Sequence, residues 1–182
     1  MTIWRNRSIA MIIMVLMIVA GTLIGSHNSL MGFRHKAQDV FTLGIKGDGI
    51  GIQGDLNERA SLAQNMVVVA RRYLPEDNAL IQNVLEAGKA QGAAKSVKEK
   101  AAANRALEIA IKDLYDVLSG MALSEQDARF PQRLYTDFQS RGATISHDPY
   151  NRGAADFNRI LSGFPAGLLG GLTGVKPLEL FE

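Results

Sequence analysis

Apolar side chains recur at alternating spacings of three and four residues in three separate stretches of the chain. This periodicity places them on one face of an α-helix, and no comparable stretch shows the alternation of a half-buried strand. The three apolar seams are Leu56, Ala60, Ala63, Val67, Ala70 and Leu74; Leu107, Ile111, Leu114, Leu118 and Met121; and Tyr150, Ala154, Phe157, Leu161 and Phe164. The pattern predicts an all-α fold in which three to four long helices form an elongated antiparallel bundle.

Helix-breaking residues mark the ends of the expected helices. Pro75 ends the first one, and Asp77 or Asn78 can cap the second. We expect this second helix to run on through the Ala- and Lys-rich residues 87–106. Pro149 should kink or interrupt the third helical region, because its ring removes a backbone hydrogen bond. This division predicts two helices of about 40 residues packed against a shorter one.

A different pattern precedes the seams. Residues Ser8–Ser26 contain no charge, and a bilayer core about 30 Å thick needs roughly 20 apolar residues in a helix. A cleaved signal peptide is the alternative, since a basic start before an apolar stretch looks the same. The length of the stretch and the bulky Ile18, at position −3 of a cut after Ala20, favour a retained anchor.

Charges flanking the apolar stretch indicate an orientation. Arg5, Arg7 and the amino terminus precede it, and Arg34 and Lys36 follow it, an imbalance of about one positive charge. The positive-inside rule then favours a cytoplasmic N-terminus and an extracytoplasmic domain. We divide the chain into a short basic N-terminus (1–7), a transmembrane anchor (8–27), a membrane-proximal helix with a glycine-rich hinge (28–54), the helical bundle (55–165) and a Gly/Leu-rich tail (166–182).

Charge and cysteine content narrow the classes of function. Of the 20 Lys and Arg residues only Arg5 and Arg7 precede Arg34, so the rest of the chain has 18 basic residues against 18 acidic ones. A nucleic-acid partner is not expected, because it requires several cations on one face. The absence of cysteine excludes disulfides, thiol nucleophiles and cysteine-ligated zinc.

Three features resemble ligand sites and are interpreted otherwise. Residues Gly49–Gly54 spell G-x-G-x-x-G before a helix, but a dinucleotide site also needs a preceding strand and a βαβ unit, so we interpret them as a hinge. Asp48 supplies one carboxylate where a calcium loop needs several. His27, His35 and His147 lack the spacing of paired metal ligands. We therefore expect no catalytic residue, no cofactor and no metal.

The last seam contains a seven-residue repeat. Seven residues are two helical turns, so the rings of Tyr150, Phe157 and Phe164 share one face of a helix. Asn151 and Asn158 lie beside them. We expect the rings to form one buried stripe facing Ala63 to Leu74. The amides of Asn65, Asn151 and Asn158 should be at least partly buried and hydrogen-bonded between helices, because an unpartnered buried amide costs about 1–3 kcal/mol. The residues with this structural role are Asn65, Tyr150, Asn151, Phe157, Asn158, Phe164 and Pro165.

The repeat resembles the C-terminal signature of the LemA family, Y-N-x5-[YF]-N-x5-F-P, and here reads YNRGAADFNRILSGFP from Tyr150 to Pro165. A second block, RASLAQNMV from Arg59 to Val67, is similar to the family's R-x-D-L-I-P-N-L-V, with Ser61 in place of Asp and Gln64 in place of Pro. The glycine-rich residues 44–54 depart from the family, whose members more often continue a helix there.

The resemblance implies a bacterial single-pass membrane protein with a helical bundle and without known enzyme activity, cofactor or metal. We therefore predict a membrane-anchored helical interaction or scaffold protein of the bacterial envelope, without catalysis. The alternative is a signal-transducing or envelope-stress accessory protein whose bundle changes state on partner binding. The expected partners are the membrane and an unidentified protein, and a homo-oligomer is an open possibility.

Overall fold

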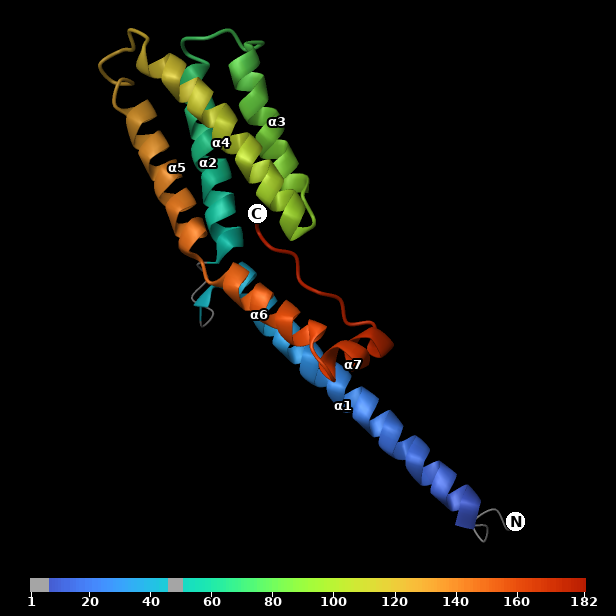
Figure 1. The fold of residues 1–182 in the computed structure, drawn as a ribbon. Coiled ribbons are helices and arrows are strands. Elements are labelled where there is room, and N and C mark those ends of the chain that lie inside the picture. Colours follow the sequence, from blue (N-terminus) through green and yellow to red (C-terminus); the bar gives the residue numbers. More distant parts are fainter. Residues whose placement is uncertain (1–6, 46–50) are drawn as a thin grey trace. The chain divides into compact units, whose positions relative to one another are not determined.

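The computed structural model describes residues 7–45 and 51–182, and within these ranges every regular element is a helix (Figure 1). The elements are α1 (Arg7–Leu43), α2 (Ile52–Ala70), α3 (Ala79–Ala93), α4 (Val97–Ser119), α5 (Phe130–His147), α6 (Tyr150–Ser162) and α7 (Ala166–Thr173). The predicted all-α fold is confirmed. The chain forms two compact units, Met1–Gln38 with Arg152–Leu178 and Asp39–Asn151 with Glu179–Glu182.

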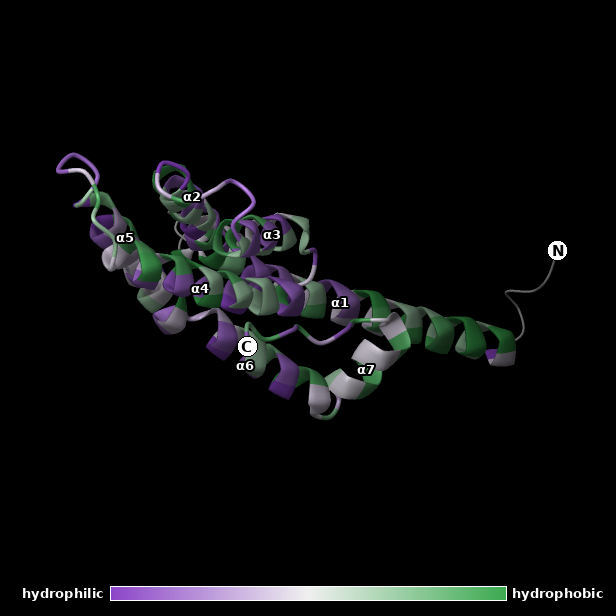
Figure 2. Ribbon diagram, turned by 90° about the horizontal axis from the view of Figure 1, so that it is seen from above, coloured by the Kyte–Doolittle hydropathy of each residue, from purple (hydrophilic) through white to green (hydrophobic). Residues whose placement is uncertain are grey.

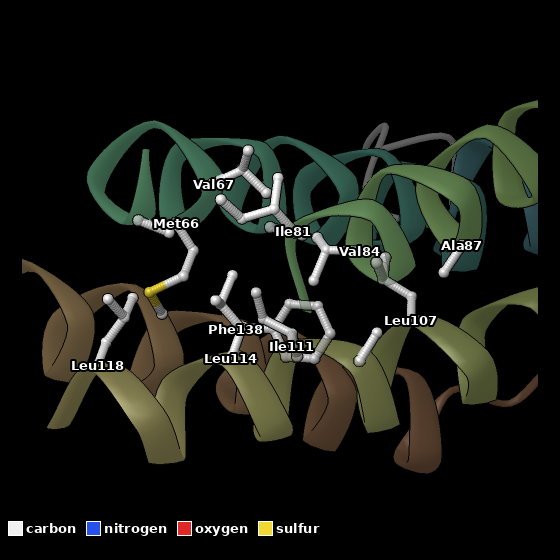
Figure 3. Packing of buried hydrophobic residues seen from close by; sticks show 13 residues of the cluster. Met66, Val67, Ile81, Val84, Ala87, Leu107, Ile111, Leu114, Leu118 and Phe138 are labelled. Carbon is white, nitrogen blue, oxygen red and sulfur yellow. The ribbon is translucent and has the colours of Figure 1, made fainter. Parts of the chain in front are cut away.

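The bundle of α2 to α5 lies in the second unit. Helix α2 packs against α5 and α3, and α3 packs against α4 (Figure 1). The first two seams supply much of its core, since Ala63, Val67 and Ala70 of α2 are buried against Leu107 and Leu114 of α4 and their neighbours (Figure 3). Burying each large apolar side chain stabilises the fold by about 1.5–3 kcal/mol. The core therefore follows the predicted periodicity.

The expected long second helix is wrong, because the chain breaks at Ala94, Lys95 and Ser96. The Ser96 side chain accepts from the backbone N–H of Glu99, and the Glu99 carboxylate accepts from the backbone N–H of Ser96, a capping box. These bonds satisfy backbone donors that open the first turn of α4. The segment is a helical hairpin of α3 and α4 in place of one helix.

The third helical region is interrupted where Pro149 predicts it. Helix α5 ends at His147 and α6 begins at Tyr150. The Asp148 carboxylate accepts from the backbone N–H of Tyr150, 2.8 Å away, so it caps the start of α6 as Pro149 ends α5.

Helix α1 is continuous from the predicted anchor to Leu43. Gly44, with φ 79°, ends it in the left-handed region that favours glycine. Gly51 precedes α2, and a Cβ there would lie 2.6 Å from the Phe41 carbonyl oxygen. These two glycines of the expected hinge therefore allow a close backbone approach. Residues 46–50 of that hinge, with Gly49 of the G-x-G-x-x-G pattern, lie outside the described residues.

In the first unit, α1 supplies one continuous helix and α6, α7 and the following segment supply the rest. Phe157 and Ala154 of α6 are buried, as are Leu30 of α1 and Val175. Between Met11 and Val19, by contrast, most apolar side chains of α1 are exposed. The part of α1 toward the N-terminus is coloured largely hydrophobic in Figure 2. This helix is long and apolar enough to cross a membrane, with a mean hydropathy of 2.5 over its most apolar window.

Candidate functional site

The segment after α7 is extended, and asparagine side chains hold its backbone. Asn151 donates through Nδ2 to the Phe181 carbonyl oxygen at 2.9 Å, and its Oδ1 accepts from the Phe181 N–H at 2.7 Å. Asn158 makes the same pair of bonds with Leu178, both at 2.8 Å. Each amide therefore pairs with one residue's N–H and C=O, as a neighbouring β-strand would.

The seven-residue repeat explains the spacing of these bonds. Seven residues along α6 rise about 10.5 Å, and three residues of extended chain span about 10 Å. Asn151 and Asn158 are seven residues apart, and their partners Phe181 and Leu178 are three apart in the opposite order. The repeat therefore matches a helix to an extended segment that runs antiparallel to it.

Two more groups fix the end of this segment in the second unit. The Tyr150 hydroxyl donates to the Glu179 carbonyl oxygen at 2.7 Å, and the backbone N–H of Lys98 donates to the Glu179 carboxylate at 3.0 Å. The Phe41 ring contacts two others, with its centroid 5.0 Å from that of Tyr150 and 6.1 Å from that of Phe181. Backbone bonds and ring contacts together order residues 179–182. We call Phe41, Lys98, Tyr150 and Asn151 the backbone clamp.

The repeat residues do not all take the expected places. Tyr150 and Phe157 are buried, but Phe164 is 89 % exposed because α6 ends at Ser162 and leaves the ring and Pro165 outside the helix. The continuous aromatic stripe facing Ala63 to Leu74 is therefore wrong.

The partners of α2 and of the asparagines also differ from expectation. Helix α2 packs on α5, where Phe138 lies in the same core cluster as Ala63. Asn151 and Asn158 are partly buried and hydrogen-bonded as expected, but to the extended segment, and Asn65 is exposed on α2.

A buried arginine lies in the middle of the bundle. Arg59 of α2 is 1 % exposed, its guanidinium carbon is 3.9 Å from the centroid of the Phe138 ring, and its Nη2 is 3.2 Å from Oε2 of Glu108. Burial lowers the pKa of Arg59 below its ordinary value, and the hydrogen bond and charge of Glu108 oppose this effect. One turn earlier, the buried Asp55 pairs with Arg141 of α5 at 3.2 Å. These ion pairs join α2 to α4 and α5.

A cavity of about 490 Å³ opens beside Arg59. Its polar lining includes Asn104, Arg105, Glu108 and Gln139, and residues of the clamped segment form part of its wall. Within the described residues, Arg59 Nε and Asn104 Oδ1 are buried without a hydrogen-bond partner. Clefts of this size are typical of small-ligand sites. Side chains of both charge signs line the cavity, Arg59 and Arg105 with Glu108.

The carboxylates that line this cavity, in the part of the chain that the structure describes, are Glu108 and Glu182. No three His, Asp or Glu side chains there lie close enough together to hold a metal ion. Glu108, the carboxylate nearest to Arg59, is already paired with it. The arrangement suits binding of a polar chain or small molecule through hydrogen bonds.

Tyr150 and Asn151 of this site were expected to have a structural role, but the burial of Arg59 and the segment that Asn151 binds were not predicted. Arg59 was noted only as part of a family-like block, because a charged residue in a seam-bearing helix is normally solvated. The clamped residues 178–182 have no periodicity that would predict a partner. The available signal was the asparagine repeat itself, since two amides on one helix face at a spacing of two turns suit an extended backbone.

Comparison with known proteins identifies a family. The LemA family model matches residues 50–182, which include α2 to α7 and the clamped segment. The comparison with curated proteins found no similar protein.

Proposed function

The chain belongs to the LemA family, and from this premise we propose that it is a membrane-anchored, non-catalytic interaction or scaffold module of the bacterial envelope. The observation that carries the proposal is the apolar part of α1, whose side chains from Met11 to Val19 are largely exposed. Exposing so much contiguous apolar surface to water is unfavourable, whereas a bilayer accommodates it. In this proposal α1 crosses the membrane and the bundle meets a protein partner.

The proposed sidedness rests on charge. Arg5, Arg7 and the amino group precede the apolar segment, and Arg34 and Lys36 follow it, so the N-terminal side has one more positive charge in the sequence. We place the bundle on the extracytoplasmic side. We propose no catalytic role for the polar cavity, in which Glu108 is paired with Arg59 at 3.2 Å.

The anchor is tested by carbonate extraction of membranes from cells that make the full chain. The wild type should remain in the pellet, and Ile18→Arg should weaken insertion, because an arginine at the centre of a spanning helix costs about 2.5–3.5 kcal/mol. Ile109→Arg is the matched control, since Ile109 is an equally exposed isoleucine of α4. Release of the wild type, or equal behaviour of both variants, would contradict the anchor.

The interaction role is tested by a photo-crosslinking amino acid placed in intact cells at exposed apolar positions of the bundle. Val68 of α2 and Ile109 of α4 are such positions. A discrete crosslinked protein supports a scaffold or interaction module, with Lys89 on α3 as an exposed polar control. Crosslinks to lipid or none at all at every position would refute the role.

A further inference from the structure

The backbone clamp recognises peptide groups and makes few demands on side chains. Asn151 binds the N–H and C=O of residue 181, and Tyr150 binds the C=O of residue 179. Any extended chain presents these groups at the same spacing, which is how β-strand addition binds peptides. Selectivity is left to two contacts, the Phe41 ring against residue 181 and the Lys98 N–H toward an acidic side chain at 179.

The cavity continues from the clamp. Asn151 lines it as well as binding the segment, and Phe181 and Glu182 form part of its wall. The cavity that these residues help to line has a volume of about 490 Å³. Arg59 Nε and Asn104 Oδ1, both on side chains more than nine-tenths buried, have no hydrogen-bond partner among the described residues. Both side chains line the cavity.

We propose that the clamp and its cavity form a binding site for an extended peptide of another protein chain, which takes the place of residues 179–182. The peptide carries an acidic residue where Glu179 lies and a large apolar one where Phe181 lies, and it extends into the cavity beside Arg105. This inference rests on the proposed function, because it specifies the partner chemistry of the interaction module.

The chain's own segment competes with any such peptide. A segment joined to its site by a short connection has an effective concentration in the millimolar range. A free peptide therefore binds weakly until the segment is released. Its apparent dissociation constant rises with the fraction of sites that the chain's own segment occupies. Weakening the segment without altering the clamp should reveal the site.

The substitution Phe181→Pro does this, because proline lacks the backbone N–H that donates to Asn151. The probe is a fluorescein-labelled peptide with the sequence of residues 175–182, VKPLELFE, titrated by fluorescence polarisation with the full chain in detergent. We expect binding to Phe181→Pro at least about 10-fold tighter than to the wild type. Adding Asn151→Ala should abolish the gain, and adding Asn65→Ala, the matched exposed asparagine, should preserve it.

A second probe isolates backbone recognition. The same peptide methylated on the nitrogen of its phenylalanine keeps every side chain but cannot donate to Asn151, so it should bind at least about 10-fold more weakly. Equal binding of both peptides, or no saturable binding to Phe181→Pro with a wild-type circular dichroism spectrum, would overturn the proposal. If Phe181→Pro does not give that spectrum, Phe181→Ala replaces it, since it removes the contact with Phe41 and keeps the backbone bonds. A gain of about threefold is then expected, and no gain overturns the proposal.

The source of the peptide follows from light scattering of the wild type over a range of concentrations. Self-association that disappears in Phe181→Pro and in Asn151→Ala identifies a second copy of this chain as the source, and a monomer throughout excludes it. If the peptide does not bind but the crosslinks at Val68 and Ile109 are retained, the proposed interaction function holds and uses a different surface. Loss of the crosslinks alone would contradict the proposed function and leave the peptide site intact.

Discussion

Replacing Phe138 by leucine tests whether the buried Arg59 is held by its contact with an aromatic ring. Phe138 is fully buried in the core cluster, and the Arg59 guanidinium carbon lies 3.9 Å from its ring centroid. Leucine keeps an apolar side chain in the core and removes the π-face. The substitution therefore separates the filling of space from the attraction between cation and ring.

The expected cost has two parts. A hydrophobic swap of similar volume costs less than about 1.5 kcal/mol. A cation–π contact in a desolvated site contributes about 1–2 kcal/mol. Phe138→Leu should therefore cost about 2–3 kcal/mol, a shift of roughly 6–15 °C in the unfolding midpoint for a domain of this size.

Arg59→Met supplies the second side of a double-mutant cycle. Methionine fills much of the same space, removes a charge whose burial is unfavourable, and leaves the half-exposed Glu108 to water. In this background Phe138→Leu should cost only about 1 kcal/mol, so the coupling is about 1–2 kcal/mol. Urea unfolding of the full chain in detergent, followed by circular dichroism, measures all four variants. An equal cost of Phe138→Leu in both backgrounds would show that the ring only fills space.

Three further predictions concern other parts of the chain and use the same unfolding measurement. Phe157→Ala should cost about 3–5 kcal/mol because the ring is buried, and unfolding like wild type would show it to be accessible. Gly51→Ala should be destabilising, because its Cβ would lie 2.6 Å from a carbonyl oxygen of α1, whereas Gly88→Ala, with open space around it, should be neutral or stabilising; similar effects would contradict the close approach. The Tyr73 hydroxyl, and secondarily an arginine, holds the pKa of Asp127 below its ordinary value of 3.8. Asp127→Asn should therefore be less stable than wild type at pH 7, and the difference should vanish as pH falls below about 4 through the lowered pKa. A loss of stability that does not depend on pH would contradict this origin.

The bundle could be predicted from sequence because its core obeys a local rule. Leu107, Ile111, Leu114 and Leu118 recur at three and four residues, and all four are buried on one face of α4. The break before α4 was missed because the Ala- and Lys-rich composition favours a helix everywhere around it. The sequence does contain a helix-capping pattern at this break, with Ser96 three residues before Glu99. The spacing of apolar residues alone does not reveal it.

The site was less accessible to such reasoning because its contacts join distant segments. Nothing local distinguishes Asn65, which is exposed, from Asn151, whose partner is 30 residues away. Phe164 has the spacing of its seam but lies beyond the end of α6, so helical periodicity no longer applies to it. The burial of Arg59 depends on Phe138 and Glu108 meeting it from two other helices.

The hairpin of α3 and α4 also has a consequence for the order in which the bundle folds. Only Ala94, Lys95 and Ser96 separate the two helices, whereas α2 and α5 meet across about sixty intervening residues. Closing the short loop loses less chain entropy, and local contacts form faster than distant ones. We expect the hairpin to be formed in the transition state and α5 to dock after it. Substitutions between α3 and α4 should then slow folding, and substitutions in α5 should chiefly accelerate unfolding.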